Sequence, residues 1–339
     1  MKIRASIGSA ITLKKLQGRL SAEPTTIYLM TYFKNKCLAN CSFCTQARSS
    51  STNNNSLSRV SWPEFEIEKL FEEYSDLKFN SLKRICVQAV NYKNVFRDVL
   101  KIVRYLKNIS NLPVSISIKP LNNKQIRLLH EAGVERICFP VDAANEKLFN
   151  MFKGVEVGGP YDFKTHLNAL TRAVEIFGRF KVTTHLIIGL GETEKEAVEF
   201  IFNMKEKGVN VGLFALTPLK GTALEEAQPP LKESYRRVQI VRYLIFNENL
   251  RREQLTFNQN GLIKDVKLPL NQLNLIIQSG NPFLTSGCPD CNRPYYNEKV
   301  SGPVYNYPSI GLVKKDIQKI KTELGELFNE LESYPAYNK

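Results

Sequence analysis

The sequence contains few histidines, no long apolar run and no recognisable export signal. Only three histidines occur among 339 residues, at positions 130, 166 and 185, which agrees with chemistry that depends little on this residue as an acid or base. No stretch supplies the roughly eighteen consecutive apolar residues of a membrane span. The N-terminus, MKIRASIG, lacks the apolar core and cleavage site of a secretory signal peptide. We therefore predict a cytoplasmic protein without a membrane partner.

Cysteine is present, but in an odd number, seven. A small secreted domain held by disulfides normally has an even number in a much shorter chain, so that class is excluded. In a reducing cytosol, clustered cysteines more often bind metal or carry out chemistry. The cysteines are therefore the residues from which a function is to be inferred.

A repeated pattern of short apolar strand, turn and amphipathic helix indicates a parallel sheet built of βαβ units. Six such units suit a curved partial barrel of the (β/α)6 type at least as well as an open sheet. The predicted strands are 26–32, 84–90, 114–118, 136–141, 182–188 and 211–216, and the main predicted helices are 61–74, 95–106, 124–132, 193–207 and 313–332.

The composition divides the chain into a central unit and two flanking segments. We expect an N-terminal extension over residues 1–25 and the barrel over residues 26–256. Residues 257–339 are loop-rich and too poor in apolar residues for a core of their own, so we predict an extension that wraps the barrel. Residues 49–58 (SSSTNNNSLS) are polar and are predicted to form a mobile surface loop.

Three cysteines follow the first predicted strand in the sequence Cys37-Leu-Ala-Asn-Cys41-Ser-Phe43-Cys44. Thiolates at this spacing can reach three irons of a cubane cluster and leave the fourth iron open to a substrate. Phe43 can shield such a cluster from water. A structural zinc loop is the alternative, although it would require a fourth local ligand.

The CxxxCxxC spacing with its aromatic residue resembles the radical S-adenosylmethionine (SAM) superfamily. The resemblance implies a [4Fe–4S] cluster held by Cys37, Cys41 and Cys44, with SAM on its open iron. It also implies further cofactor contacts at the ends of later strands. These are Gln88 and Ala89 for the methionyl ammonium, Gly189 and Glu192 in the GLGE turn for adenosine, and Leu216 and Pro218 in the FALTPLKGT segment for adenine.

Asp142 and His185 each have a structural and a functional interpretation. Asp142 follows the fourth strand, where its carboxylate could hold ribose hydroxyls or cap the next helix. His185 shares the inward parity of its strand with Thr183. We expect His185 to be a packed core histidine.

The other four cysteines are Cys86, Cys138, Cys288 and Cys291, and together they could hold a second, auxiliary [4Fe–4S] cluster. Cys86 shares a strand face with Gln88, and Cys138 shares one with Asp142, so both could point into the barrel. The alternative for these two is a small buried hydrophobe. For the Cys288–Cys291 pair, a CxxC, the alternative is half of a zinc site.

Locally, the barrel resembles biotin synthase in its RIC segment at 84–86 and in its GLGET segment. Cys86 coincides with an auxiliary-cluster ligand of that family. Where biotin synthase has further cluster cysteines, however, this chain has Ser115 and Thr183, so its auxiliary site must be ligated differently.

Over nearly its whole length the chain resembles one subunit of the two-subunit, archaeal-type lipoyl synthases. The resemblance runs from SIGSAI through CLANCSFCTQAR to TSGCPDCNRPYYNE and GPVYNYP. It implies sulfur insertion at C6 and C8 of an octanoyl chain on a lipoyl carrier domain or H-protein. Such C–H bonds are not acidic, so a 5′-deoxyadenosyl radical is required and the auxiliary cluster donates sulfur. A second homologous radical SAM subunit and an electron donor such as ferredoxin are the other implied partners.

Two other function classes stay open at this point: a biotin synthase-like enzyme with a small-molecule substrate, and a cluster-bearing scaffold subunit. The basic excess, a net charge of +14, fits an acidic carrier protein or simply a solvated surface. The basic residues occur as scattered pairs and no RNA-binding motif is visible, so we do not expect a nucleic-acid partner.

Overall fold

The computed structural model describes residues 1–72 and 81–324. Its main sheet has eight strands in the order β10-β9-β8-β7-β6-β2-β1-β5. The strands from β10 to β2 are mutually parallel, which confirms the predicted curved α/β sheet of the partial-barrel type. The bounds are β1 Lys2–Ala5, β2 Thr26–Thr31, β5 Glu64–Glu66, β6 Arg84–Gln88, β7 Val114–Ser117, β8 Val134–Cys138, β9 Val182–Ile188 and β10 Val209–Ala215. Two short pairs lie apart from it, β3 Ser56–Leu57 with β4 Val60–Ser61, and β11 Leu255–Phe257 with β12 Ile263–Val266.

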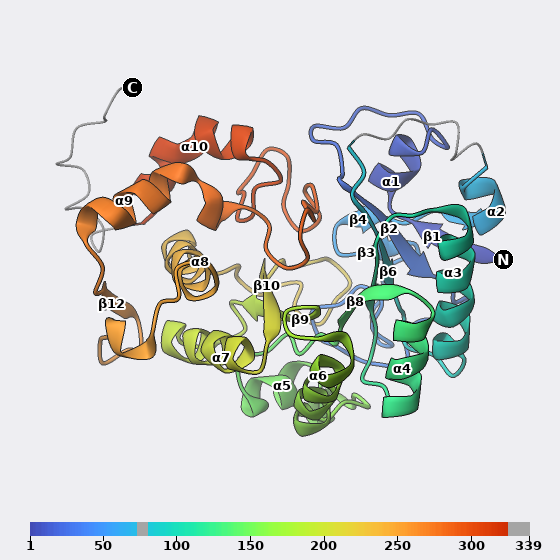
Figure 1. Ribbon diagram of the computed structural model, residues 1–339, viewed down its shortest axis with the longest axis horizontal. Helices are drawn as coiled ribbons and strands as arrows, with labels where there is room; N and C mark the ends of the chain where they lie inside the picture. The colour runs from blue at the N-terminus through green and yellow to red at the C-terminus, as the bar shows by residue number, and fades with distance from the viewer. Residues whose placement is uncertain (73–80, 325–339) are drawn as a thin grey trace.

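Helices cover the outer face of the parallel strands (Figure 1). Local sequence sets where several of them begin: Asn122 and Thr193 each form a capping box, with Gln125 and Glu196 respectively. The helices are α1 Ile7–Thr12, α2 Ile67–Leu70, α3 Val95–Ile109, α4 Asn123–Glu131, α5 Glu146–Phe152, α6 Phe163–Phe177, α7 Glu194–Glu206, α8 Lys232–Asn247, α9 Leu270–Ser279 and α10 Ile310–Thr322. In the described ranges, none of these helices has both the length and the apolar run that a membrane crossing requires.

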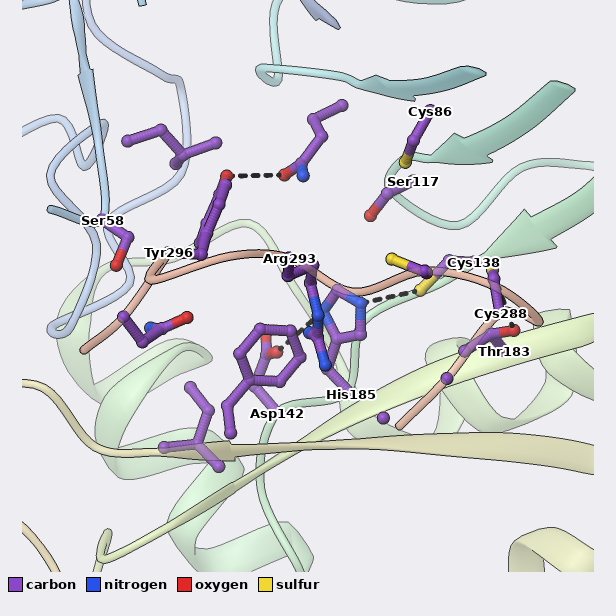
Figure 2. Close-up of a pocket in the computed structure, with 18 of the residues that line it drawn as sticks. Ser58, Cys86, Ser117, Cys138, Asp142, Thr183, His185, Cys288, Arg293 and Tyr296 are labelled. Carbon is purple, nitrogen blue, oxygen red and sulfur yellow. Dashed lines mark hydrogen bonds and ion pairs between the residues drawn. The ribbon is translucent and has the colours of Figure 1, made fainter. Parts of the chain in front are cut away.

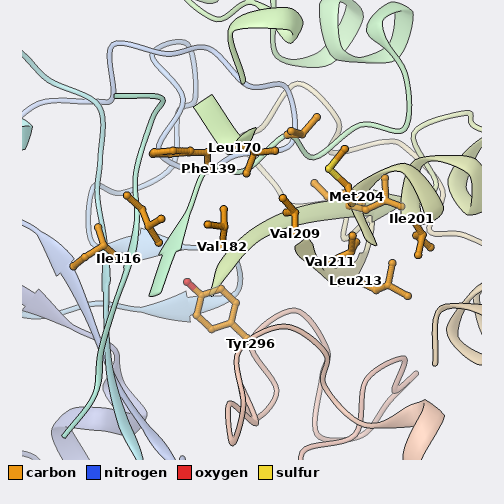
Figure 3. Close-up of a cluster of buried hydrophobic side chains, with 14 of the residues drawn as sticks. Ile116, Phe139, Leu170, Val182, Ile201, Met204, Val209, Val211, Leu213 and Tyr296 are labelled. Carbon is orange, nitrogen blue, oxygen red and sulfur yellow. The ribbon is translucent and has the colours of Figure 1, made fainter. Parts of the chain in front are cut away.

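Strand alternation separates the core from the barrel interior. Outward side chains of β9 and β10, such as Val182, Val209 and Val211, are fully buried with Ile201 and Met204 of α7 in one apolar cluster (Figure 3). The intervening inward side chains line a cavity instead: Thr183, His185, Gly212 and Phe214. The period of two therefore directs polar and reactive residues to the interior.

The helix predicted from Ser61 is wrong. Residues Glu64–Glu66 form an edge strand that pairs antiparallel with β1, with Ile3 opposite Phe65. Of the residues that the structure describes in this range, only Ile67–Leu70 is helical. Tyr74, the end of the predicted helix, lies outside the described residues. The pairing with β1 also brings part of segment 1–25 into the main sheet. Tertiary strand pairing thus overrides a local helix-start signal.

The polar segment 49–58 is a loop, as its composition predicts. Hydrogen bonds hold it to neighbouring segments, whereas we predicted a mobile loop. The Ser50 hydroxyl donates to the carbonyl of Gly221 at 2.7 Å, and the Gln46 amide donates to the carbonyl of Ser56 at 2.6 Å. Its serines and asparagines satisfy backbone groups instead of facing only solvent. Consequently Leu57 and Ser58 are held where they line the barrel cavity.

The C-terminal region crosses the barrel. We call residues 284–308 the strap; in Figure 1 this orange segment runs between β10 and the N-terminal strands. The strap is tied to β10 by a bond from Leu213 N to Ser286 Oγ, 2.8 Å, and to the start of β2 by one from Thr25 N to Asn292 Oδ1, 3.0 Å. Residues 325–332 of the last predicted helix lie outside the described residues.

Candidate active site

Two groups of cysteines line two adjoining cavities inside the barrel. The first group is Cys37, Cys41 and Cys44, and the second is Cys86, Cys138, Cys288 and Cys291; we call the cavities by the same numbers. Residues that line both cavities form the boundary between them. They are Phe43, Cys44, Leu57, Gln88, Ser117, Asp142 and His185.

The first group lies on the loop that leaves β2, and backbone amides point at its sulfurs. Cys37 Sγ accepts from Ala39 N and from Asn91 N, each at 3.4 Å, and Cys44 Sγ accepts from Gln46 N at 3.4 Å. Such N–H···S bonds stabilise negative charge on sulfur, as iron–sulfur ligands require. The loop therefore provides part of what a metal-bound thiolate needs.

Burial acts against ionisation of the same thiols. It raises the pKa of Cys44 to about 12 and also raises the pKa of Cys37 and Cys41. Metal ligands must be thiolates, so three buried cysteines with high pKa values need a cation to compensate them. Three cysteine donors, amides directed at sulfur and a low-polarity cavity together fit a [4Fe–4S] cluster with one open iron.

Asp142 and Lys153 form a buried ion pair in the wall of the first cavity. Lys153 Nζ lies 2.6 Å from Asp142 Oδ2, and the two side chains are 6% and 10% exposed. Burial opposes the charge of Lys153, but Asp142 together with Cys41 and Cys138 outweighs burial, and the pKa of Lys153 is raised. Asp142 itself has φ +71°, which is a strained backbone conformation for this residue. Two backbone hydrogen bonds, one donated by Asp142 N and one accepted by Asp142 O, hold it in the sheet.

The helix-cap interpretation of Asp142 is wrong, because Asn145 caps α5 by accepting from Leu148 N. Asp142 instead lines both cavities, as Gln88 does. This is where a group that holds a ribose hydroxyl between the two sites would stand. Ala89, the other residue predicted to contact methionine, lines the first cavity.

The second group is assembled from three parts of the chain. Cys86 comes from β6 and Cys138 from β8, whereas Cys288 and Cys291 come from the strap. Figure 2 shows Cys86, Cys138 and Cys288 directed into one space together with Thr183 and His185. The predicted inward parity of Cys86 and Cys138 is correct, and these cysteines line a cavity instead of filling the apolar core.

Cys288 lies against the hydroxyls of Ser115 and Thr183. Its sulfur is 3.7 Å from Ser115 Oγ and 4.0 Å from Thr183 Oγ1. The strap therefore brings a cysteine to the wall where the strands themselves have only hydroxyls. Gly212 makes room for it, because a Cβ at this position would come within 3.3 Å of Ser286 O.

The four thiols of the second group influence one another electrostatically. Burial raises the pKa of Cys86 well above its ordinary value, and Cys288, Cys291 and Cys138 raise it further. Burial likewise raises the pKa of Cys138 and Cys291. Four cysteines that line one cavity suit a closed cluster, whose irons would neutralise the thiolates.

His185 is not the packed core histidine that we expected. Its Nε2 lies 3.4 Å from Cys138 Sγ, and its Nδ1 lies 3.8 Å from Asp142 Oδ1. Burial lowers the pKa of His185 to about 4, so the ring is neutral near pH 7 and its approach to Asp142 is not an ion pair. His185 is not packed in the core because its strand position directs the side chain into the barrel, where the interior is a cavity.

The remaining predicted cofactor residues divide into two kinds. Leu216 lines the second cavity. The Glu192 carboxylate accepts from Gly189 N at 2.7 Å and from Leu190 N at 3.0 Å, so it shapes the turn after β9. Gly189 has φ +107° and leaves no room for a Cβ beside Pro230. Neither Gly189, Glu192 nor Pro218 is among the residues that line the two cavities.

Several lining residues were missed from the sequence. Arg293 and Tyr296 follow the CxxC directly, and that proximity was the signal for them. Arg293 stacks over Phe214 at 3.9 Å, and Tyr296 donates to Gln88 Oε1 at 3.4 Å. Lys153 and Tyr161 of the first cavity had no local signal, because only the fold brings them to the cysteines.

Both cavities contain polar groups without a partner among the described residues. Gln46 Oε1 in the first cavity and Ser58 Oγ in the second are buried and make no hydrogen bond. Within residues 1–72 and 81–324, no three His, Cys, Asp or Glu side chains are grouped closely enough for a single metal ion.

Comparisons with known proteins give relatives of low sequence identity. A biotin synthase of Clostridium acetobutylicum is 26% identical over 226 residues, which cover 63% of this chain and 64% of that protein. An uncharacterized protein of Methanocaldococcus jannaschii is 28% identical over 151 residues, 43% of this chain and 38% of that one. The chain therefore spans less than two thirds of the length of these relatives.

Among solved structures, HydG, a maturase of the [FeFe]-hydrogenase, superposes with a TM-score of 0.51 at 18% identity, over 65% of this chain and 50% of that one. This likeness concerns the fold. The sequence profile of the Radical SAM superfamily matches residues 31–204, a range that includes the first cysteine group and ends before the strap. The profile covers just over half of the chain, and the protein belongs to the radical SAM superfamily.

Proposed function

We propose that this protein is a sulfur-inserting radical SAM enzyme that acts on an octanoyl chain carried on a lysine of a lipoyl carrier protein. The observation that carries the proposal is the second cysteine group, which lines a cavity adjoining that of the first. Sulfur insertion needs a sulfur source beside the site where the substrate radical forms. Two cysteine groups that share the walls Phe43, Gln88 and Asp142 meet this requirement.

The cofactors would supply the chemistry and the chain would position and shield them. When bound, the first cluster and SAM supply a 5′-deoxyadenosyl radical, and the auxiliary cluster supplies sulfur. Gln88 and Asp142 would hold polar parts of SAM at the boundary of the two cavities. The apolar residues Leu57, Ile187 and Leu216 line the second cavity and would exclude water from a carbon radical.

The biotin synthases among the relatives support sulfur insertion as the reaction class, at identities of 20–29%. The strap motifs TSGCPDCNRPYYNE and GPVYNYP favour lipoyl synthesis over biotin synthesis, because these two motifs resemble those of the two-subunit lipoyl synthases. An octanoyl amide is uncharged and apolar, as is much of the lining of the second cavity.

The partners follow from the same proposal. An octanoylated carrier domain or H-protein would deliver the substrate, a second homologous radical SAM subunit would complete the pair of insertions, and a ferredoxin would donate electrons in the cytoplasm. A net charge of +14 would speed encounters with acidic partners of this kind.

A small-molecule substrate is the second candidate, and one observation favours it. Arg136 and Arg293 both line the second cavity, and a guanidinium there could pair with a substrate carboxylate. A biotin precursor has such a carboxylate, whereas octanoyl-lysine has none.

The test is turnover of an octanoyl-lysine peptide by the anaerobically reconstituted protein, analysed by mass spectrometry. We expect one sulfur to be added at C6 or at C8, and the second subunit to be needed for the other position. Dethiobiotin is the competitor: thiolation of dethiobiotin but not of the peptide would support the small-molecule alternative. A chain that forms no 5′-deoxyadenosine without a partner would instead be a scaffold subunit.

A further inference from the structure

Tyr28 of β2 touches the strap at the second cysteine group. Its hydroxyl accepts from Arg293 N at 2.8 Å, and the same oxygen lies 3.4 Å from Cys291 Sγ. Tyr28 is opposite Cys86 in the pairing of β2 with β6. One hydroxyl therefore contacts the strap backbone and a cysteine of the group at once.

Counting donors and acceptors assigns the direction of the second contact. The Arg293 backbone N–H can only donate, so the Tyr28 oxygen accepts from it. A tyrosine hydroxyl has a single proton, and that proton is then free to point to the Cys291 sulfur. A Cys291 thiolate bound to a cluster has no proton of its own, so in that state the bond is O–H···S, with sulfur as the acceptor.

The surroundings keep the hydroxyl in this position. Tyr28 is 3% exposed, so its hydroxyl is shielded from bulk solvent. Its ring lies 6.3 Å from that of Tyr296, which packs edge-on against the fully buried Trp62. Rotation of Tyr28 away from Cys291 would require these rings to repack.

We propose that Tyr28 is a positioning residue for the second cysteine group: it anchors the CxxC segment through Arg293 N and donates a hydrogen bond to the Cys291 sulfur. This role rests on the proposed function, in which the group holds an auxiliary cluster. Reduction adds negative charge to a cluster, and a donor on a ligand sulfur stabilises that charge. Tyr28 therefore raises the reduction potential of the auxiliary cluster relative to the same site without the hydroxyl.

The experiment compares Tyr28→Phe with Tyr235→Phe in the reconstituted full chain. Tyr235 is a matched control, because it is fully buried and its hydroxyl donates to Asn306 Oδ1 at 3.0 Å, in the strap but away from the cysteines. Iron content is measured first, and EPR-monitored redox titration then gives the potential of each cluster. We expect Tyr28→Phe to shift the auxiliary-cluster potential downward, with the first cluster unchanged, and Tyr235→Phe to shift neither.

Selective loss of the auxiliary irons in Tyr28→Phe, with full iron in Tyr235→Phe, would support the anchoring part of the role. An unchanged auxiliary potential in a fully loaded Tyr28→Phe protein would overturn the proposal and leave the proposed function intact. Equal iron loss in both variants would also overturn it, since loss of either hydroxyl that bonds to the strap would then have the same effect. A wild-type chain that holds only the first cluster would refute the proposed function itself, and the role of Tyr28 with it.

Discussion

The two cysteine groups reach the same barrel in opposite ways. The first occupies eight consecutive residues, Cys37 to Cys44, on one loop, and neighbouring amides bond its sulfurs. The second joins β6, β8 and the strap, positions separated by as many as 205 residues of sequence, from Cys86 to Cys291. A local group needs only its loop to form, whereas the assembled group needs the complete fold with the strap closed on it.

Because the two groups are built differently, substitutions can disturb one group without the other. Changes in the loop should affect radical formation and everything that depends on it. Changes in the strap should affect only the second group, because the first has no ligand there. The predictions below test this separation, from the largest expected effect to the smallest.

Replacement of single cysteines should divide the reaction into two parts. In Cys44→Ala we expect both 5′-deoxyadenosine and thiolated peptide to fall to background, because the radical source has lost a ligand. In Cys288→Ala we expect 5′-deoxyadenosine to persist while thiolated peptide is lost. Both products are measured by mass spectrometry of one anaerobic reaction mixture. Loss of 5′-deoxyadenosine in Cys288→Ala would mean that the groups are not separable.

The ion pair in the wall of the first cavity should be a large stability determinant. Lys153→Met leaves the Asp142 carboxylate buried without its partner, and breaking a buried pair in this way costs about 3–5 kcal/mol of unfolding free energy. The double variant Lys153→Met with Asp142→Asn removes both charges, so part of that loss should return. Urea unfolding of the iron-free proteins measures both. A double variant no more stable than the single one would contradict the pairing.

The strap should depend on the absence of a side chain at position 212. Gly212→Val places carbon against Ser286 and Gly287, and such overpacking typically costs about 1–3 kcal/mol. We expect the variant to lose the irons of the second group and to keep those of the first. Gly8→Ala is the control, since a Cβ there meets nothing within 4 Å. Full iron content in Gly212→Val would contradict this prediction, because the strap could then move without loss of the second group's irons.

The last prediction concerns His166, which lines the first cavity. Burial lowers its pKa to about 3, so the folded protein binds fewer protons than the unfolded chain between pH 6.5 and 3. Its contribution to stability is therefore complete above pH 6.5 and is lost as the pH falls. One pKa unit corresponds to about 1.4 kcal/mol, so the loss from pH 6.5 to pH 5 is about 2 kcal/mol.

His166→Gln should remove that part of the pH dependence, even though it lowers stability at pH 7.5 by disturbing the packing against Phe149 and Tyr161. Urea unfolding of iron-free wild type and variant at pH 7.5 and pH 5 gives the comparison. Parallel losses in both proteins would assign the acid sensitivity to other groups.

Much of this architecture could be predicted from the sequence, because it is encoded locally. Each of the six parallel strands coincides with a short apolar segment, and the period of two correctly directed Cys86 and Cys138 inward. The CxxxCxxC loop was visible for the same reason: its members are neighbours in the sequence. The GLGE turn was also visible, although Glu192 proved to shape the turn instead of lining a cavity.

What could not be predicted depends on contacts between distant segments. The edge strand Glu64–Glu66 requires β1 as a partner, and the local cap signal at Ser61 does not report that partner. Lys153 and Tyr28 have no distinguishing sequence context; one meets Asp142 across a helix, and the other meets Cys291 from 263 residues away. The role of His185 was predicted wrongly. Its position in the strand shows that the side chain points into the barrel, but not whether the barrel interior is packed or is a cavity.

The central claim is that the seven cysteines form one open and one closed cluster site, and the iron content of two proteins tests it most directly. After anaerobic reconstitution, the wild-type chain should hold about eight irons, and the variant with Cys288→Ala and Cys291→Ala about four. The irons that remain in the variant should still respond to SAM in the EPR spectrum. About four irons in both proteins would contradict the account, because the strap cysteines would then bind no cluster.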